Sequence, residues 1–201
     1  MIKPEATIAK LQAGKPVVIA ALGDSLTQGW MVRRGFLDYL REMLLRHYPY
    51  SSLTILNRGI PGDTADFGLQ RLHPDILNSH PDCIFVQYAL NDAFQGSPPW
   101  QFKETIRGII DEIQASGSAD IVLITSVFLA DPRDYGHILP YYRHLEDLGA
   151  EYRLSVACVH AHWHQTVAAG VDFGRLVQSD LVHPTEEGYL YMAEAVMEVF
   201  R

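Results

Sequence analysis

The sequence predicts an α/β fold, a three-layer α/β/α sandwich in which helices cover both faces of a parallel sheet of about five strands. Five short apolar runs rich in β-branched residues recur along the 201 residues, and segments with helical periodicity lie between them. Continuous apolar runs are typical of strands that are buried on both faces. Their alternation with helices favours a parallel sheet. Because the composition is even and no repeat or linker interrupts it, we expect one domain over residues 1–201.

The elements follow one another in a regular order. The expected strands are residues 17–22, 53–56, 83–90, 121–127 and 156–159. Apolar stripes over residues 36–47 and 106–113 predict two of the helices. The last helix is expected to hold Pro184 in its first turn, with Glu186 and Glu187 near the positive end of the helix dipole. The apolar face of this helix is formed by Tyr189, Met192, Ala193, Val196 and Val199.

Charge and composition exclude several classes of function. A formal net charge of -8 argues against a nucleic-acid-binding surface and favours a small-molecule substrate. Cys83 and Cys158 are the only cysteines, too few for a disulfide framework or a zinc ribbon. No apolar run approaches the length of a membrane span, and the first ten residues lack a signal-peptide core. We therefore expect a cytoplasmic protein without an integral membrane segment. The sequence gives no indication of the oligomeric state.

Three residues could form a nucleophilic triad. Ligands of parallel α/β sheets bind beyond the carboxyl ends of the strands, and Ser25 lies three residues after the end of the first apolar run. His183 precedes Pro184, which keeps it in an extended loop, and Asp180 lies three residues earlier. A serine hydroxyl becomes a nucleophile when a base takes its proton and a third group orients that base. Ser25, His183 and Asp180 are therefore the candidate nucleophile, base and orienting acid.

An oxyanion that forms on the substrate needs fixed hydrogen-bond donors. The backbone N–H of Gly62 is a candidate, because a glycine lets the chain approach a substrate closely. The side-chain amide of Asn91 and the backbone N–H of Ser25 are two more. Gly59 lies close enough in the sequence to compete with Gly62 for this role.

Four short blocks of sequence resemble those of the GDSL-type esterases of the SGNH hydrolase superfamily. The blocks are Gly23-Asp24-Ser25-Leu26, Gly62-Asp63-Thr64, Asn91-Asp92 and Asp180-Leu181-Val182-His183. They occur in the family order and span nearly the whole chain. The third block departs from the family pattern Gly-x-Asn-Asp, because Ala89 takes the place of its glycine and is expected to tighten the turn under Asn91.

The resemblance implies a flavodoxin-like fold and hydrolysis of carboxylic esters through an acyl-enzyme, with no metal or organic cofactor. We expect small or short-chain esters, because 201 residues leave little chain for a cap over a five-stranded sheet. A carbohydrate O-deacetylase, a thioesterase and a lysophospholipase of the same superfamily stay open. Outside the enzymes, a catalytically silent module that binds a small ligand is the alternative.

Related nucleophile and phosphate motifs are absent from the sequence. An α/β-hydrolase nucleophile elbow reads Gly-x-Ser-x-Gly, and Thr27 stands where its second glycine would be. Neither the Gly-Lys-Ser/Thr ending of a phosphate-binding loop nor a dinucleotide-binding fingerprint after the first strand is present.

Several further residues have both a functional and a structural interpretation. Asp24 either faces the substrate pocket or braces the loop of Ser25, while Asp63 and Asp92 are expected to cap the helices that follow them. Residues 130–136 are polar and turn-rich and could form a rim or lid. His160, His162 and His164 alternate as in a strand, which would favour a metal site, but Trp163 beside them favours packing. The aromatic residues that could line the pocket or pack the loops are Trp30, Phe94, Trp100, Phe128 and Tyr135.

Overall fold

One wholly parallel sheet organises residues 2–201, which the computed structural model describes. Its strands are β1 (Pro16–Gly23), β2 (Ser52–Gly59), β3 (Cys83–Gln87), β4 (Asp120–Ile124) and β5 (Ser155–Ala157). They lie in the order β2-β1-β3-β4-β5, and every neighbouring pair is parallel. This is the strand order of flavodoxin-like folds. The predicted fold class is therefore confirmed, and each of the five predicted runs overlaps a strand.

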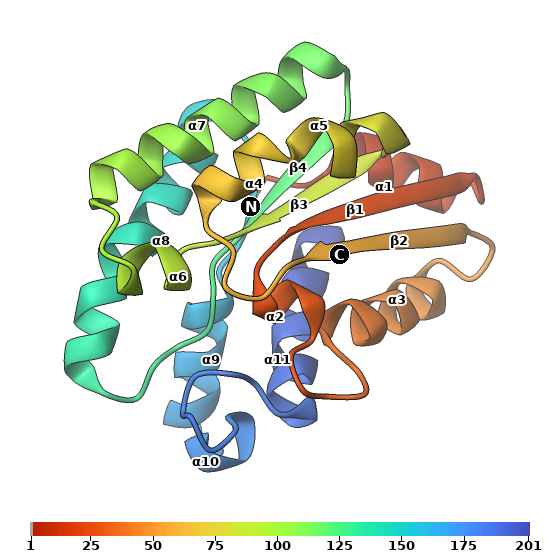
Figure 1. Ribbon diagram of the computed structural model, residues 1–201. Helices are drawn as coiled ribbons and strands as arrows, with labels where there is room; N and C mark the ends of the chain where they lie inside the picture. Colours follow the sequence, from red (N-terminus) through yellow and green to blue (C-terminus); the bar gives the residue numbers. More distant parts are fainter. Residues whose placement is uncertain (1) are drawn as a thin grey trace.

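Helices cover both faces of the sheet (Figure 1). The longer ones are α1 (Glu5–Gln12), α3 (Phe36–His47), α7 (Pro99–Ser116), α8 (Pro132–Tyr152), α9 (Val159–Ala168) and α11 (Glu186–Met197). The short ones are α2 (Ser25–Gln28), α4 (Ala65–Gln70), α5 (Leu72–Asp75), α6 (Leu90–Phe94) and α10 (Phe173–Leu176), with the 3-10 turns η1 (Leu77–Ser79) and η2 (Glu198–Phe200). Helices α4, α7 and α8 form one layer, and α3, α11 and α9 form the other.

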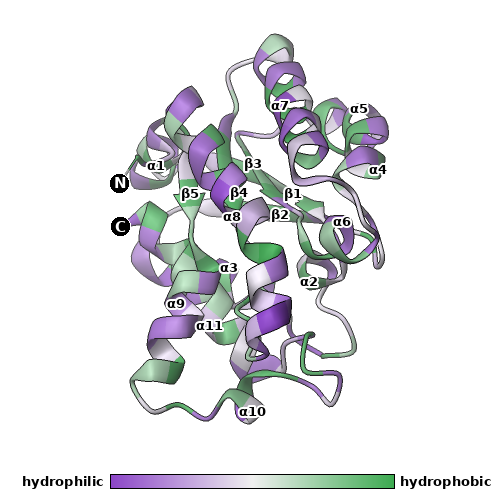
Figure 2. Cartoon of the chain, turned by 90° about the vertical axis from the view of Figure 1, so that its left-hand side faces the viewer, coloured by the Kyte–Doolittle hydropathy of each residue, from purple (hydrophilic) through white to green (hydrophobic). Residues whose placement is uncertain are grey.

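The core lies between these layers. All residues of β3 are buried, as continuous apolar strands in a parallel sheet require. The predicted apolar face of the last helix is buried as well, from Tyr189 through Val196. Figure 2 shows hydrophobic strands enclosed by helices whose outer sides carry the hydrophilic residues. Within residues 2–201, no helix combines the length and the apolar character that crossing a bilayer requires.

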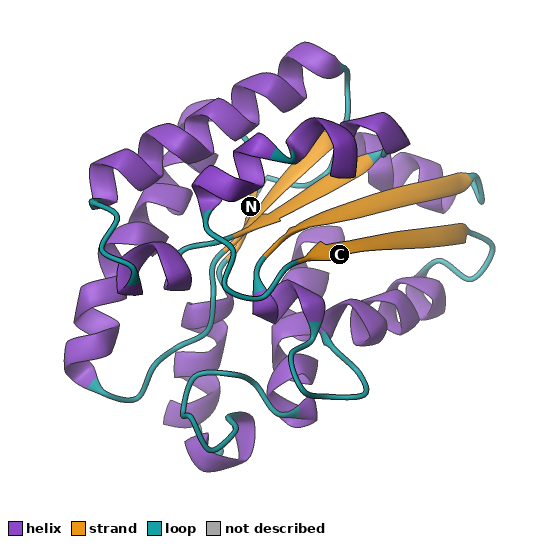
Figure 3. Ribbon diagram, in the orientation of Figure 1, coloured by secondary structure: helices purple, strands orange, loops and turns teal. Residues whose placement is uncertain are grey.

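The sheet register brings three loops to one edge. Gly23 of β1 pairs with Gly59 of β2 on one side and with Gln87 of β3 on the other. The next residues of these three strands therefore leave the sheet side by side, at the carboxyl edge where α2 and α6 begin (Figure 3). Ser25, Gly62 and Asn91 come two, three and four residues after this shared row.

Three predicted boundaries are corrected by the structure. The third strand ends at Gln87 rather than at residue 90, because Ala89 has a positive φ of 133° and α6 begins at Leu90. The fourth strand ends at Ile124, although the segment 125–127 is fully buried. Pro184 is not in the last helix: α11 begins after Thr185, whose side chain accepts a hydrogen bond from the Gly188 N–H.

Residues 130–136 do not form a polar loop. Helix α8 begins within them, at Pro132, and Asp131 is its N-cap, accepting hydrogen bonds from the N–H groups of Arg133 and Asp134. A proline in the first turn after a capping aspartate is a standard helix start. The polar residues that suggested a rim or lid are therefore the first turn of a long helix.

Candidate active site

Ser25 sits at a tight connection between β1 and α2. The carboxylate of Asp24 caps α2 by accepting the Leu26 N–H at 2.8 Å. A Cβ on Gly23 would lie 2.2 Å from the Thr27 hydroxyl and 2.7 Å from the Gln87 carbonyl, so only a glycine allows the strand to turn this closely into the helix. This connection presents Ser25 as the first residue of α2.

Ser25, His183 and Asp180 form a continuous chain of hydrogen bonds. Ser25 Oγ lies 2.9 Å from His183 Nε2, and His183 Nδ1 lies 2.7 Å from Asp180 Oδ2. With the Nδ1 proton donated to Asp180, Nε2 carries the lone pair that can accept the serine proton. The structure thus brings together the three residues that sequence reasoning selected.

The Asp180 carboxylate also folds its own loop. Its Oδ1 accepts the Val182 N–H at 3.0 Å and the His183 N–H at 2.9 Å. Partial burial alone would raise the pKa of Asp180, but these two bonds and the one from the His183 ring lower it below its ordinary value. Asp180 is therefore a carboxylate at neutral pH and can stabilise an imidazolium at His183.

Gly62 occupies a turn that a glycine suits. The Asp63 N–H donates to the Ile60 carbonyl at 3.1 Å, which closes a turn over residues 60–63 with Pro61 at its second position. Gly62, at the third position, has a φ of 79°, as expected for glycine in a type II turn. Of the two candidate glycines, Gly59 is needed for packing, because a Cβ there would lie 2.2 Å from the Gln28 nitrogen. Apart from Gly62 itself and its two chain neighbours, no atom of the described residues lies within 4 Å of a Cβ built on Gly62, so its surroundings are open.

Asn91 lies on α6 beside this turn. Its Nδ2 donates to the Asp63 carbonyl at 2.9 Å, which leaves the second amide hydrogen free for another acceptor. Neither the Ser25 N–H nor the Gly62 N–H has a hydrogen-bond acceptor among residues 2–201. The edge of the sheet therefore holds a serine, a base and a set of uncommitted donors.

Comparison with known proteins agrees with this geometry. Residues 21–190 match the GDSL-like Lipase/Acylhydrolase family. The chain belongs to this family. It is 31% identical over 128 residues to an arylesterase of Vibrio mimicus, covering 62% of this chain and 60% of that protein. It is also 31% identical over 116 residues to thioesterase 1/protease 1/lysophospholipase L1 of Escherichia coli K12, covering 57% of this chain and 52% of that protein. The chain thus matches only a little over half the length of these relatives.

Solved structures share the fold of this GDSL-like family member. Axe2, an acetylxylan esterase from Geobacillus stearothermophilus, superposes with a TM-score of 0.80 at 20% identity, over 92% of this chain and 94% of that one. LAE5, an enzyme from the metagenome of Lake Arreo, superposes with a TM-score of 0.82 at 16% identity and the same coverage. Both likenesses therefore extend over most of this chain and show its fold.

Asp24 does not face a pocket, contrary to one of its two interpretations. It is 1% exposed, and its second oxygen lies 3.3 Å from Gln87 Nε2. Burial raises the pKa of Asp24 to about 7, despite the hydrogen bonds from Leu26 and Gln87 that favour the carboxylate.

Gln87 itself is fully buried and also forms hydrogen bonds with Thr27 and Ser126, so it supports the connection between β1 and α2 that carries Ser25. A single polar residue at the end of an apolar strand was the signal that could have identified it.

The other two loop acids do not cap the helices that follow them. Asp63 accepts hydrogen bonds from Arg71, at 2.9 Å from Nε and 2.6 Å from Nη2. Asp92 lies inside α6 and accepts the Ala65 N–H at the start of α4, at 2.9 Å. Both acids therefore join separate elements. Sequence reasoning missed Arg71, which lies in a segment of mixed polar and apolar residues that gives no signal for it.

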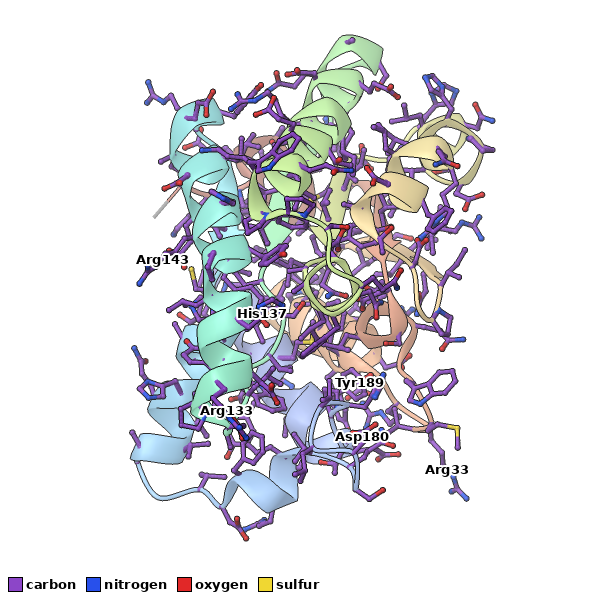
Figure 4. The ribbon with its side chains drawn as sticks, turned by 60° about the vertical axis from the view of Figure 1, so that its left-hand side comes forward. Arg33, Arg133, His137, Arg143, Asp180 and Tyr189 are labelled. Atoms are coloured by element: carbon purple, nitrogen blue, oxygen red, sulfur yellow. The ribbon has the colours of Figure 1, made fainter. Side chains whose placement is uncertain are left out.

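Among the aromatic candidates, Trp30 and Phe94 lie beside the catalytic elements. The Trp30 ring centroid is 5.8 Å from that of His183, and Trp30 is 36% exposed. The backbone N–H of Trp30 donates to the Tyr189 hydroxyl at 3.1 Å. Figure 4 shows Tyr189 and Asp180 near the loop from which Arg33 points outward. Phe94, on α6 with Asn91, is 51% exposed.

The remaining aromatic candidates serve mainly in packing or lie apart from the triad. Phe128 packs against Tyr135 and Phe173, with ring centroids 4.8 Å and 6.0 Å away, and so joins α8 and α10 to the loop after β4. Trp100 is 67% exposed at the start of α7, and no contact joins it to the triad within residues 2–201. For Phe128 and Tyr135 the packing interpretation holds.

The histidine triplet lies on helix α9 and not on a strand. On a helix, residues two apart point in different directions, and the three side chains have different partners. His160 contacts Thr125 at 2.9 Å, His162 lies 3.7 Å from Glu194, and the His164 ring packs on Phe128. The reasoning that placed three imidazoles on one face is therefore wrong. In the part of the chain that the structure describes, no group of three potential ligands could hold a metal.

Proposed function

We propose that the protein is a serine esterase that hydrolyses small or short-chain carboxylic esters through an acyl-enzyme. The observation that carries the proposal is the hydrogen-bond chain from Ser25 Oγ through His183 to Asp180, with distances of 2.9 Å and 2.7 Å. Family membership supports a hydrolase that acts on esters. The names of the relatives, an arylesterase and a thioesterase/lysophospholipase, point the same way.

The reaction runs in two halves. His183 Nε2 takes the proton of Ser25 as Oγ attacks the ester carbonyl, and Asp180 stabilises the imidazolium that forms. The oxyanion accepts hydrogen bonds from the Ser25 N–H, the Gly62 N–H and the free amide hydrogen of Asn91. His183 then gives its proton to the leaving alcohol. In the second half, a water that loses its proton to His183 attacks the acyl-enzyme, and His183 returns the proton to Ser25 Oγ as the bond to the acyl group breaks and the acid is released.

The short elements around the site support small esters. The helices that begin at the edge of the sheet beside Ser25 and Asn91 have only four and five residues. Exposed apolar side chains near the triad, Trp30 and Phe94, offer contact area for a short acyl or alcohol group.

A carbohydrate O-deacetylase is the second candidate. The leaving alcohol departs toward His183, and the ring of Trp30 lies beside His183 with a partly exposed surface on which a sugar ring could stack. The acetylxylan esterase Axe2, whose fold this chain shares, acts on such a substrate according to its name.

Substitution of the serine tests the proposed mechanism. Ser25→Ala is expected to abolish ester hydrolysis and labelling by a fluorophosphonate, with an unchanged circular dichroism spectrum, because the nucleophile is lost and the fold is kept. Hydrolysis by Ser25→Ala at the wild-type rate would refute the assignment of Ser25 as the nucleophile. A wild-type protein that neither hydrolyses an ester nor reacts with the fluorophosphonate would instead be a silent binding module.

A panel of substrates separates the ester classes. We expect the highest kcat/KM on p-nitrophenyl acetate or butyrate within a series that extends to palmitate. Acetylated xylooligosaccharides and an acyl-CoA are run beside them. A preference for the acetylated sugar would favour the deacetylase, and one for palmitate or acyl-CoA would favour a lysophospholipase or a thioesterase.

A further inference from the structure

Arg71 has an unusual position for a cation in this fold. It lies between α4 and α5, and its side chain is 13% exposed. Nη2 is within hydrogen-bond distance of three oxygens: the Asp63 carboxylate at 2.6 Å, the Gly23 carbonyl at 3.1 Å and the Tyr88 hydroxyl at 3.1 Å. Nε adds a second bond to Asp63 at 2.9 Å, and Nη1 pairs with Asp75 at 3.0 Å. One guanidinium thus uses all three of its nitrogens.

Three partners of Arg71 belong to three different segments at the candidate active site. Gly23 ends β1, two residues before the proposed nucleophile. Asp63 follows Gly62, and its backbone carbonyl accepts the hydrogen bond from Asn91. Tyr88 follows β3, three residues before Asn91. The guanidinium therefore connects all the segments that carry proposed oxyanion donors.

The contacts of this network are specific to an arginine. Asp63 is 6% exposed and Tyr88 is fully buried, so the Asp63 charge has little access to water and depends on Arg71. Burial raises the pKa of Tyr88 well above its ordinary value, so its hydroxyl keeps its proton and donates to Asp63 at 3.0 Å. A lysine supplies one nitrogen in place of three and cannot reach these loops together.

We infer that Arg71 is a positioning residue that sets the geometry of the oxyanion hole by tying the Gly62 turn to the ends of β1 and β3. This inference rests on the proposed function. Donors to an oxyanion act only when they are held where the charge develops. A small displacement of the Gly62 turn and Asn91 therefore reduces the stabilisation of the transition state more than it reduces the binding of the substrate. Loss of Arg71 should accordingly lower kcat and leave KM nearly unchanged.

The test is a double-mutant cycle on p-nitrophenyl acetate with Arg71→Lys and Asn91→Ala. Arg71→Lys is expected to lower kcat about tenfold or more with KM within about twofold, and Asn91→Ala about 100-fold. If Arg71 acts through the oxyanion donors that it positions, the two losses should be less than multiplicative, so Arg71→Lys should lower kcat by a smaller factor in the Asn91→Ala background than in the wild type. A variant that merely loosens the fold would give losses that multiply.

Arg107→Lys is the matched control. Arg107 also binds several groups, namely Glu151, Glu104 and the Tyr152 hydroxyl, but between α7 and α8, away from the triad. Its substitution is expected to leave kcat unchanged. Should Arg71→Lys fail to fold, Tyr88→Phe replaces it in the cycle, because it removes one hydroxyl of the same network and keeps both charges.

The outcomes separate this inference from the proposed function. If the kcat losses of Arg71→Lys and Asn91→Ala multiply in the double variant, or if Arg71→Lys has the wild-type kcat, the role of Arg71 is overturned. Hydrolysis that depends on Ser25 would be unaffected by either result. A wild-type protein without esterase activity would overturn the proposed function itself. A rise in KM at constant kcat would show that Arg71 affects substrate binding and would also contradict the inference.

Discussion

Asp24 illustrates how one residue beside the nucleophile couples folding to pH. Its side chain is 1% exposed and is held by the Leu26 N–H and by Gln87. Burial raises its pKa from 3.8 to about 7 in the folded protein. Between these two values the folded state keeps a proton that the unfolded state has released, so stability falls as pH rises through this window and stays low above it.

We therefore expect the free energy of unfolding of the wild type to decrease relative to that of Asp24→Asn as the pH rises from 5 to 8. The difference grows by at most ~1.4 kcal/mol for each pH unit, because the asparagine side chain of the variant cannot ionise. Urea denaturation of both proteins at several pH values measures it. A difference that does not change with pH would show that Asp24 is ionised throughout this range in the folded protein.

Helix α6, which carries Asn91, begins at a strained residue. Ala89, its N-cap, has a φ of 133° and a ψ of -43°, a region in which a side chain is unfavourable and a glycine is not. We expect Ala89→Gly to raise the free energy of unfolding by about 1 kcal/mol, because the relief of strain exceeds the entropy that glycine loses on folding. The matched control is Ala93→Gly within the same helix, which should destabilise the protein by about 1 kcal/mol. Equal destabilisation by both glycines would contradict the strain at Ala89.

The elements also show what could be predicted from the sequence. Five apolar runs predict five strands correctly, because burial on both faces leaves a continuous pattern. The same pattern fails at segment 125–127, which is buried but is not a strand, since apolar residues report burial and not backbone conformation. The three triad candidates could be selected from the sequence because Ser25 follows a predicted strand, Asp180 lies three residues before His183, and all three fall in blocks that resemble a known family. Gln87 and Arg71 could not, because their hydrogen bonds join loops that lie far apart in the sequence.

At the scale of the whole molecule, the carboxyl and amino ends of the strands have different roles. The carboxyl edge holds the triad and the uncommitted donors. At the amino edge, Asp82 accepts the Val18 N–H at 2.7 Å and pairs with Lys10, and Asp120 accepts both the N–H and the hydroxyl of Thr7, each at 2.7 Å. A cavity of about 330 Å³ lies there, lined in part by Thr7, Lys10 and Asp82. These carboxylates fasten α1 to the sheet and are remote from the chemistry.

This division predicts that stability and activity can be changed separately. Asp120→Ala removes the carboxylate oxygen that accepts both the N–H and the hydroxyl of Thr7, which is fully buried, and is expected to lower the free energy of unfolding by about 1–3 kcal/mol with kcat unchanged. Asp147→Ala is the control, because Asp147 is 61% exposed and makes only ion pairs of 3.6 Å and 3.7 Å at the surface. It should change the free energy of unfolding much less. Urea denaturation and p-nitrophenyl acetate hydrolysis on the same preparations measure both quantities, and a parallel loss of kcat in Asp120→Ala would show that the amino edge also supports the site.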